Sequence, residues 1–233
     1  MNELLWVSSI PLAYLLYRGT KVTYNDVIAY YKNKELDNLS NKEFEKKVKI
    51  IGVGGGGSAI VEYLSNKYPN RYDSIILNSD KKALTSKNVT NKIHLEKSDD
   101  FGCGSNTLCG YNLINDSVIE KLKSFINTDK KVFIFATLGG GCGSGSVRAL
   151  SQYLPMKDLD IQYLLTTPFT WEGLKRTNRA NETIEFLKNN NAKTTVFSND
   201  DLLKFGNMSI KDCFNKQDEE FHKIIGLLFL EKS

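Results

Sequence analysis

The sequence contains little from which a metal centre or a disulfide framework could be built. Only four cysteines and two histidines occur among its 233 residues. Zinc and redox sites usually need cysteines in close pairs, whereas the cysteines here stand apart, at Cys103, Cys109, Cys142 and Cys213. We therefore predict no metal site, and we expect the four side chains to be the reduced thiols of a cytosolic protein.

The sequence also lacks a concentrated basic segment. Its 31 lysines and arginines are nearly balanced by 27 acidic residues, which leaves a formal net charge of +4. The densest group of lysines, between Lys81 and Lys97, is interleaved with Glu96 and preceded by Asp80, a pattern typical of a solvated mixed surface. Because nucleic-acid binding usually requires a basic face, we predict no nucleic-acid partner.

No apolar stretch is long enough to cross a membrane as a helix. The best candidate, residues 4–17, would reach only about 20 Å at ~1.5 Å per residue, short of a bilayer core of about 30 Å, and Pro11 interrupts it. A signal peptide would begin with basic residues, which are missing here. We therefore expect a cytoplasmic protein in which residues 4–17 pack on the domain or on a partner, or else lie on a membrane surface.

The sequence does contain a regular alternation of short apolar runs and longer helical patterns. Such alternation predicts an α/β fold, with a Rossmann-like, mostly parallel sheet and helices on both faces. The apolar runs predict buried strands at Val48–Val53, Ser74–Asn78, Lys131–Ala136, Ile161–Thr166 and Thr194–Phe197.

Two helices are predicted in the second half of the chain. Ala180, Ile184 and Leu187 recur at helical spacing, and the asparagines at 189–191 end that pattern. Ser209 stands three residues before Asp212 and resembles a capping box, so a second helix should run from there to about Leu230.

Composition divides the chain into three parts. Lys34–Lys47 is polar and charged, which places a boundary near Lys47. We predict a helical N-terminal extension over residues 1–47, apolar and then charged, a main domain over residues 48–207, and a C-terminal segment over residues 208–233.

Four consecutive glycines, Gly54–Gly57, follow the first predicted main-domain strand and precede a helical pattern. Open α/β sheets bind ligands at the carboxyl ends of their strands. Glycine lets backbone N–H groups approach an anion closely, and a helix N-terminus adds unpaired donors. The segment also fits a dinucleotide fingerprint, with Asp80 as the downstream acid, and a purely structural glycine turn is a further alternative.

A second glycine cluster, Gly139–Gly145, follows the strand at Lys131–Ala136 and also leads into a helix. A dinucleotide enzyme does not need this cluster. Two anion-binding loops on separate strand ends suit the phosphates of one nucleoside polyphosphate. Neither loop ends in the Gly-Lys-Ser/Thr of a P-loop, so no lysine is placed to reach the outer phosphates.

At these residues the sequence resembles the tubulin/FtsZ family. Gly139–Gly145 is similar to the tubulin signature, and Ile51–Ser58 is similar to the first FtsZ loop. The resemblance covers roughly residues 48–230. Further similar segments follow in order: the second nucleotide loop at Asn78–Asp80, a shortened third loop that senses the γ-phosphate at Gly102–Ser105, the ribose segment at Thr167–Arg176 and the base-proximal loop at Asn199–Leu203.

The resemblance implies GTP or GDP as the ligand, with Mg as a further candidate cofactor. It assigns the α- and β-phosphates to Gly55, Gly56, Gly57 and Ser58, and the β- and γ-phosphates to Gly141, Cys142 and Gly143, with Gly140 as a further nucleotide contact. It also implies nucleotide contacts by Asp80, Gly104 and Ser105. Cys142 replaces the family's usual threonine, and Ala59 and Glu62 stand where FtsZ often has asparagines, so weakened or altered binding is one expectation.

The resemblance places Glu172 and Arg176 at the ribose. Glu172 can accept hydrogen bonds from ribose hydroxyls, and Arg176 can reach the same sugar or a phosphate. The alternative is a helical ion pair between them, contributing about 0.3 to 0.5 kcal/mol.

Asn199 and Asp218 are implied at the guanine base. A carboxylate accepts hydrogen bonds from the N1–H and 2-amino groups of guanine and would reject adenine. As isolated residues, both would more often be surface groups.

The family's acidic catalytic residue has no clear counterpart. In tubulin-like filaments it lies in a loop after the central helix and completes the site of the neighbouring subunit, whereas Glu231 is the only acid near that position here. We therefore name no catalytic residue and expect slow GTP hydrolysis or none, a loss of about 10² to 10⁴ in rate.

We predict an FtsZ-like guanine-nucleotide-binding protein that acts in or on a cytoskeletal or cell-division filament, by self-association or with a full-length FtsZ-like protein. The alternative from the enzyme class is an active polymerising GTPase completed by a neighbouring or partner subunit. A dinucleotide-binding Rossmann protein would leave the second glycine cluster unexplained. A copy that has lost nucleotide binding is disfavoured by its retained glycine loops.

Overall fold

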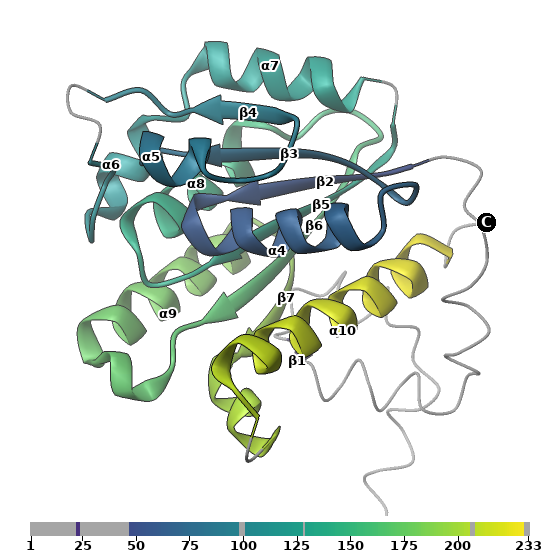
Figure 1. Cartoon of the computed structure of the whole chain (residues 1–233). Helices are drawn as coiled ribbons and strands as arrows, with labels where there is room; N and C mark the ends of the chain where they lie inside the picture. The colour runs from purple at the N-terminus through teal and green to yellow at the C-terminus, as the bar shows by residue number, and fades with distance from the viewer. Residues whose placement is uncertain (1–21, 24–46, 98–100, 128, 206–207, 231–233) are drawn as a thin grey trace, which may run out of the picture.

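The computed structural model describes residues 22–23, 47–97, 101–127, 129–205 and 208–230 (Figure 1). The elements in chain order are β1 (Val22–Thr23), β2 (Val48–Val53), α4 (Gly54–Lys67), β3 (Tyr72–Asn78), α5 (Lys81–Thr85), β4 (Asn91–His94), α6 (Thr107–Asn112), α7 (Asp116–Ile126), β5 (Lys131–Thr137), α8 (Gly141–Tyr153), β6 (Asp160–Thr167), the 3-10 turn η2 (Thr170–Glu172), α9 (Leu174–Asn189), β7 (Lys193–Ser198), the 3-10 segment η3 (Asn199–Phe205) and α10 (Ile210–Leu230).

The strands form one sheet in the order β1-β7-β6-β5-β2-β3-β4. Each neighbouring pair in this order is parallel. The register aligns Val53 at the end of β2 with Leu77 of β3 and Ala136 of β5, so the carboxyl ends of these strands lie at one edge. The predicted Rossmann-like parallel sheet is confirmed.

The five predicted strands are present with small changes at their ends. β2 has the predicted bounds, and the other four are longer by one or two residues at one end or both. Two strands were not predicted. β4 has only Ile93 buried among its four residues, and its polar sequence gives no strand pattern.

The N-terminal extension is described only at β1 and at its last residue, Lys47. Val22 and Thr23 pair with Thr195 and Val196 of β7, so these two residues form an edge strand and not a helix. The remainder of the predicted helical extension lies outside the described residues, and so does the apolar segment 4–17. Within the described part of the chain, no helix has the length and apolar character needed to cross a membrane.

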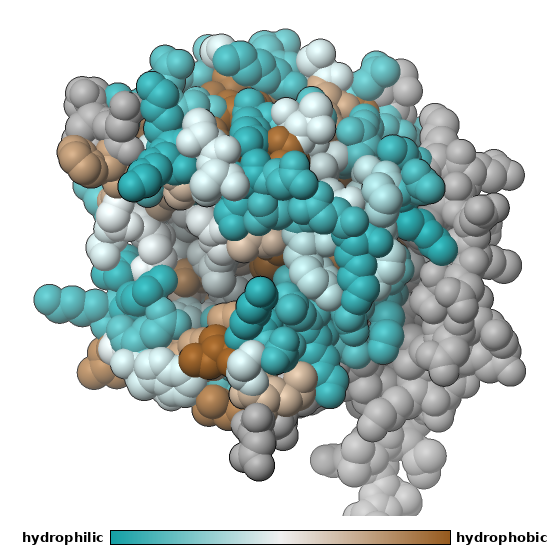
Figure 2. Space-filling model, in the orientation of Figure 1, coloured by the Kyte–Doolittle hydropathy of each residue, from teal (hydrophilic) through white to brown (hydrophobic). Residues whose placement is uncertain are grey.

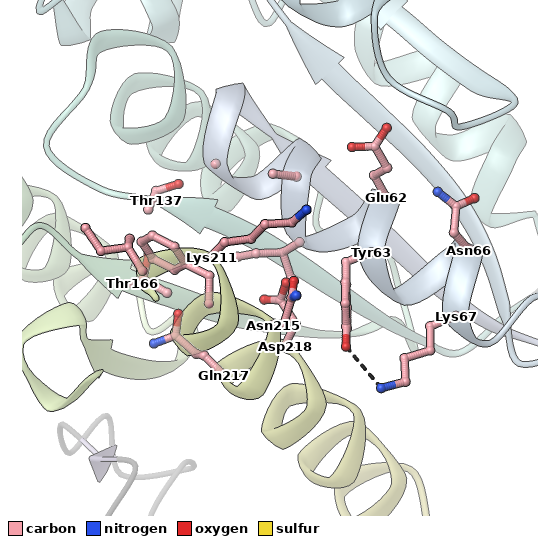
Figure 3. A pocket seen from close by; sticks show the side chains of 15 residues that line it. Glu62, Tyr63, Asn66, Lys67, Thr137, Thr166, Lys211, Asn215, Gln217 and Asp218 are labelled. Carbon is pink, nitrogen blue, oxygen red and sulfur yellow. Dashed lines mark hydrogen bonds between the residues drawn. The ribbon is translucent and has the colours of Figure 1, made fainter. Parts of the chain in front are cut away.

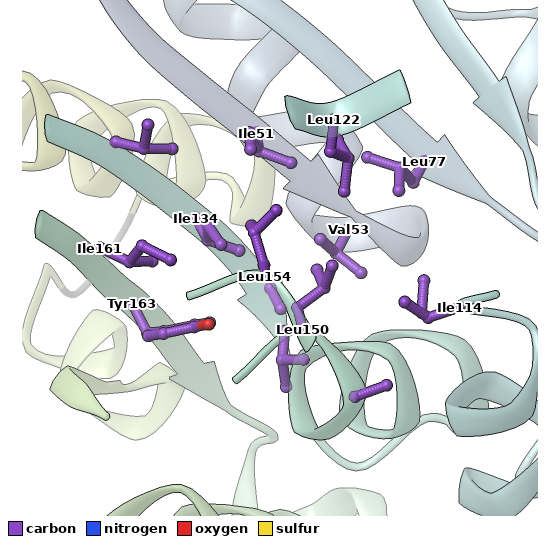
Figure 4. Close-up of a cluster of buried hydrophobic side chains, with 14 of the residues drawn as sticks. Ile51, Val53, Leu77, Ile114, Leu122, Ile134, Leu150, Leu154, Ile161 and Tyr163 are labelled. Atoms are coloured by element: carbon purple, nitrogen blue, oxygen red, sulfur yellow. The ribbon is translucent and has the colours of Figure 1, made fainter. Parts of the chain in front are cut away.

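Helices cover both faces of the sheet, as predicted (Figure 1). Alternate side chains along β5 point to opposite faces, with Ile134 in one buried cluster and Phe133 and Phe135 in the other. The first cluster joins the sheet to α7, α8 and α9. Figure 4 shows part of it, including Leu122 of α7 and Leu150 of α8. The second cluster joins the sheet to α4 and α10, with Phe221 of α10 packed edge-to-face against Phe135.

The two predicted helices are confirmed. In α9, Ala180 and Leu187 are buried, and Ile184 packs against the same core. α10 starts one residue after Ser209, whose hydroxyl oxygen accepts a hydrogen bond of 3.1 Å from the backbone N–H of Asp212. This is the N-terminal cap that the sequence predicts.

The prediction of four reduced thiols is wrong for one pair. Cys103 and Cys109 form a disulfide with their Cα atoms 5.6 Å apart, while Cys142 and Cys213 are free. The pairing arises because a turn closed by the Asn106 N–H and the Cys103 carbonyl, 2.9 Å apart, folds Cys103 back onto the first turn of α6. A separation of six residues gave no sequence signal for this pair.

Candidate nucleotide-binding site

The two glycine clusters lie side by side at the carboxyl edge of the sheet. β2 and β5 are neighbouring strands, and each leads into a glycine-rich helix start, α4 or α8. Gly54 adopts a φ of +70°, and a methyl group there would lie 2.9 Å from the backbone nitrogen of Gly143. The two loops therefore form one continuous surface.

This surface contains the N-termini of two helices without side-chain caps. Val53 precedes α4 and Gly140 precedes α8, and neither makes a side-chain hydrogen bond to its helix. The first turn of each helix has no acidic residue. The first N–H groups of a helix lack intrahelical acceptors and carry partial positive charge, so two adjacent starts favour an anion with several oxygens.

The glycines divide into packing and open positions. A methyl group at Gly57 would lie 2.2 Å from the Phe135 carbonyl oxygen, and one at Gly143 would lie 2.6 Å from that of Thr137. These glycines allow the helices to approach the sheet. Methyl groups at Gly55 and Gly140 would meet nothing within 4 Å, so these two positions face open space.

The predicted third loop joins the same surface. The Gly104 carbonyl oxygen accepts a hydrogen bond of 2.7 Å from the N–H of Gly141, the first residue of α8. Arg179 of α9 donates from Nε to the Gly139 carbonyl oxygen at 2.8 Å and from Nη2 to the Ser105 hydroxyl at 3.3 Å. Three separate segments thus meet at the start of α8.

Asp80 has a local structural contact. Its carboxylate accepts a hydrogen bond of 2.8 Å from the Ala83 N–H and so caps the short helix α5. Gly102 lies against its side chain, where an added methyl group would be 3.3 Å from the Asp80 Cβ. Asp80 is not among the residues that line the neighbouring cavity.

A cavity of about 960 Å³ opens beside the glycine loops, between α4, the ends of β5 and β6, and the first turns of α10. A volume of this size is in the range of small-molecule sites. Figure 3 shows Thr137 and Thr166 at one side of it, Tyr63 on α4, and Lys211 reaching across from α10. Gly56 also lines the cavity, so the first glycine loop and the cavity are continuous.

Asp218 and Phe214 project from α10, one helical turn apart, into this cavity. Asp218 is 6% exposed, and burial raises the pKa of its carboxyl group to about 7. The partly buried ring of Phe214 provides a flat apolar surface beside it. An acceptor next to an aromatic ring suits a planar heterocycle with N–H donors.

Four buried side-chain oxygens in this region have no hydrogen-bond partner among the described residues. They are Thr137 Oγ1, Thr166 Oγ1, Ser58 Oγ and Asn199 Oδ1, and the two threonines line the cavity. Buried polar atoms are nearly always hydrogen-bonded in folded proteins. A polar ligand that supplies these partners would fit the residues present.

Glu172 and Arg176, which the family resemblance places at the ribose, form an ion pair with each other, the alternative given above. Glu172 Oε2 and Arg176 Nη1 are 2.7 Å apart, and Glu172 Oε1 also accepts from the Phe169 N–H at 2.9 Å. Neither residue lines the cavity, and neither does Asn199. The structure therefore brings Gly56 and Asp218 together at the cavity and leaves the ribose pair outside its lining.

Residues 47–207 match the model of the GTPase domain of the tubulin/FtsZ family. The chain belongs to this family. The FtsZ cell division protein of Aquifex aeolicus is 30% identical over 183 residues, which cover 77% of this chain and 50% of that protein. The mitochondrial division protein fszB of Dictyostelium discoideum is 28% identical over 191 residues, covering 79% and 52%. This tubulin/FtsZ chain thus spans about half the length of the curated relatives it matches.

Solved structures of the tubulin/FtsZ family share the fold. An empty FtsZ dimer from M. jannaschii aligns with a TM-score of 0.68 and 27% identity, covering 84% of this chain and 58% of that one. CetZ2 from Haloferax volcanii, in a GTPgS-bound protofilament, also has a TM-score of 0.68, with 22% identity and coverage of 78% and 58%. The predicted family and fold class are confirmed.

Several residues at the site of this tubulin/FtsZ chain were not singled out from the sequence. Thr137 and Thr166 each follow an apolar strand run as its first polar residue, which is the signal that could have found them. Phe214 precedes Asp218 by one helical turn and shares its face. Arg179 carries no such signal, because its role depends on how α9 packs against the start of α8.

Exposed apolar side chains occur in the segments near the first turns of α10. Trp171, Leu174, Leu203 and Ile210 are each at least half exposed and lie in η2, η3 and the starts of α9 and α10. Figure 2 shows apolar patches on this face near the starts of α9 and α10, whereas the outer face of α4 is largely hydrophilic.

Proposed function

We propose that this chain binds a guanine nucleotide, GTP or GDP. The observation that carries the proposal is the pair of helix starts at Gly54 and Gly141, which have no side-chain caps, lie side by side and adjoin a cavity containing Asp218. The helix starts suit the phosphates, and the cavity suits the nucleoside. Mg²⁺ is a further candidate that would be held chiefly by the phosphate oxygens.

Asp218 and Phe214 support the choice of guanine. An ionised carboxylate accepts from both the N1–H and the 2-amino group of guanine, whereas adenine presents an unprotonated N1 at the equivalent position. An unpaired buried acceptor is costly, so adenine should bind more weakly. Phe214 offers a ring on which the base can stack.

We infer that the 233-residue chain alone hydrolyses GTP slowly or not at all. Among the described residues, the first turns of α4 and α8 contain no acid. Asp80 caps α5, and Glu172 pairs with Arg176. A general base for the attacking water would therefore have to come from elsewhere, which keeps open the alternative of a polymerising GTPase completed by a neighbouring subunit.

We infer that the protein acts in the cytoplasm in or on a cell-division or cytoskeletal filament. Relatives named as cell division and mitochondrial division proteins support the process. The exposed apolar residues Trp171, Leu174 and Ile210 support self-association or association with a full-length FtsZ-like protein.

The decisive experiment identifies any nucleotide that copurifies with the protein and then titrates the emptied protein with GTP, GDP and ATP by calorimetry. We expect guanine nucleotide and a preference of at least about 10-fold over ATP. Equal binding of ATP would overturn the role of Asp218, and no binding of any nucleotide would overturn the proposed function.

Phosphate release should then be followed over a range of protein concentrations, together with light scattering. Little release by the chain alone agrees with the proposal. Release that rises steeply with protein concentration or with an added FtsZ-like protein would favour the polymerising GTPase.

A further inference from the structure

The disulfide between Cys103 and Cys109 lies in the segment that meets the start of α8. The two cysteines enclose Gly104 and Ser105, the residues that contact Gly141 and Arg179. The presence of a disulfide does not by itself imply a role in nucleotide binding. Its position, however, determines how the enclosed turn is held against the second glycine loop.

Each cysteine is anchored to a different element. The Cys103 N–H donates to the Ser79 hydroxyl at 3.1 Å, just after β3, and its side chain is buried. The Cys109 N–H donates to the Asn106 side chain at 3.0 Å in the first turn of α6, and its side chain is partly exposed. The disulfide thus links the end of β3 to α6 across the turn.

α6 in turn packs directly on α8. A methyl group at Gly110, next to Cys109, would lie 2.3 Å from the Gly141 carbonyl oxygen, and one at Gly145 would lie 2.0 Å from that of Thr107. With the bond closed, the two ends of the turn around Gly104 are joined covalently, one beside Ser79 after β3 and the other on α6, which packs on α8. With the bond open, only the hydrogen bonds and packing hold it.

We propose that Cys103 and Cys109 form a reversible thiol–disulfide switch that sets the affinity of the adjoining site for nucleotide phosphates. The proposal rests on the proposed nucleotide binding. Disulfides of cytosolic proteins are usually transient and redox-sensing, which suits a switch better than a permanent brace. The free Cys213 lies in α10, whose first turns line the cavity, and takes no part.

The oxidant is a small-molecule disulfide. The partly exposed Cys109 attacks it as a thiolate, which forms a mixed disulfide and releases one small thiol. The Cys103 thiolate then attacks the Cys109 sulfur and expels the second small thiol, leaving the Cys103–Cys109 bond. Two protein thiols lose two electrons and two protons, and the small disulfide gains them as two thiols.

The closed bond should strengthen phosphate binding, because it removes alternative conformations of the Gly104 turn. If the reduced turn occupies the closed arrangement about one tenth of the time, the dissociation constant rises about 10-fold on reduction. Guanosine, which lacks phosphates, should bind equally in both states.

The test begins with alkylation and mass mapping of the wild-type protein after exposure to oxidised or reduced glutathione. We expect the 103–109 disulfide after oxidation and two alkylated thiols after reduction. GTP and guanosine are then titrated into both forms. We expect about 10-fold weaker GTP binding by the reduced form and unchanged guanosine binding.

Two variants provide the comparison. Cys103→Ser with Cys109→Ser should bind GTP like the reduced wild type under both conditions, whereas Cys213→Ser, which removes the buried free thiol of α10, should respond like the wild type. Wild-type protein alone still decides the question if the double variant does not fold.

Three results would overturn the switch. One is equal GTP affinity of the oxidised and reduced wild type, and another is failure of glutathione to form the 103–109 bond. The third is an affinity change that maps to a mixed disulfide on Cys142. Absence of nucleotide binding in both redox states would instead contradict the proposed function, while the alkylation pattern would still report whether the bond forms.

Discussion

Asp218 is a buried acid, and among the described residues the one cause that shifts the pKa of its carboxyl group is burial, which raises it. Replacing it with asparagine changes one acceptor oxygen into a donor nitrogen that would face the N1–H of guanine. We expect Asp218→Asn to weaken GTP binding about 10- to 100-fold and to leave ATP binding nearly unchanged, as measured by calorimetric titration.

The matched control for this prediction is Glu220→Gln on the same helix. Glu220 pairs with Lys223 at 3.0 Å and does not line the cavity, so GTP binding should not change. Equal losses in both variants would indicate a general effect on α10 and would contradict the base-recognition role of Asp218.

The raised pKa of Asp218 also predicts how stability depends on pH. Its carboxyl pKa increases from 3.8 to about 7 on folding, so the folded protein holds this proton more tightly than the unfolded chain does. The stabilisation is therefore complete below about pH 4 and is lost as pH rises toward 7.

Urea unfolding of the nucleotide-free protein checks this. The difference in unfolding free energy between wild type and Asp218→Asn should fall by about 2 to 3 kcal/mol between about pH 5 and pH 8, with the wild type losing stability relative to the variant. A difference that stays constant with pH would mean that the Asp218 carboxyl group titrates normally. GTP affinity should rise over the same interval as the carboxylate ionises.

At the level of elements, the glycines at the start of α4 differ in their surroundings, because some pack closely against the sheet and others face open space. Gly57→Ala would place a methyl group 2.2 Å from the Phe135 carbonyl oxygen, so α4 or β5 must shift. We expect a loss of about 3 kcal/mol in unfolding free energy, measured by urea denaturation.

Gly55→Ala is the matched substitution, because a methyl group there meets nothing within 4 Å. Its effect on stability should stay within about 1 kcal/mol, since alanine favours a helix more than glycine does. Similar losses for both variants would show that the packing of Gly57 against β5 is not what limits this position.

The sequence predicted the elements whose own residues form a recognisable strand or helix-capping pattern. β2, β5 and β6 are apolar on both faces, which marks strands covered by helices on both sides, and Ser209 with Asp212 marked the start of α10. β4 was missed because edge strands need few buried residues. β1 could not be expected, since Val22 and Thr23 become a strand only through pairing with β7.

The candidate site likewise contains residues that the sequence predicts and contacts that it does not predict. Its glycines could be predicted from the sequence, because few other structures need glycine clusters at the ends of strands. The contacts of Arg179 with Gly139 and Ser105, and the disulfide across the Gly104 turn, depend on how distant segments pack. Whether the Glu172–Arg176 pair opens to hold a ribose also depends on the ligand and not on local sequence.

At the scale of the whole molecule, nucleotide binding should stabilise the fold. The site joins α4, α8, α10 and the ends of β5 and β6, none of which keep this arrangement in the unfolded chain. At a GDP concentration 100 times its dissociation constant, we expect about 2.7 kcal/mol of added stability.

For a domain of this size, that gain corresponds to an increase of about 5 to 10 °C in Tm, measurable by scanning calorimetry. ATP at the same concentration serves as the control and should raise the Tm less. A Tm that does not respond to GDP would show that no nucleotide binds the folded chain tightly.

The pairing of β1 with β7 has a consequence for synthesis on the ribosome. The chain adds β3 beside β2 first, then β4 at one edge, and then β5, β6 and β7 successively at the other. Val22 and Thr23 emerge before all of these strands, yet their partners Thr195 and Val196 are made near the end. At ~5–20 residues per second, β1 waits on the order of 10 to 30 s for β7. Of the described strands, the one that is translated first is therefore the one that completes the sheet last.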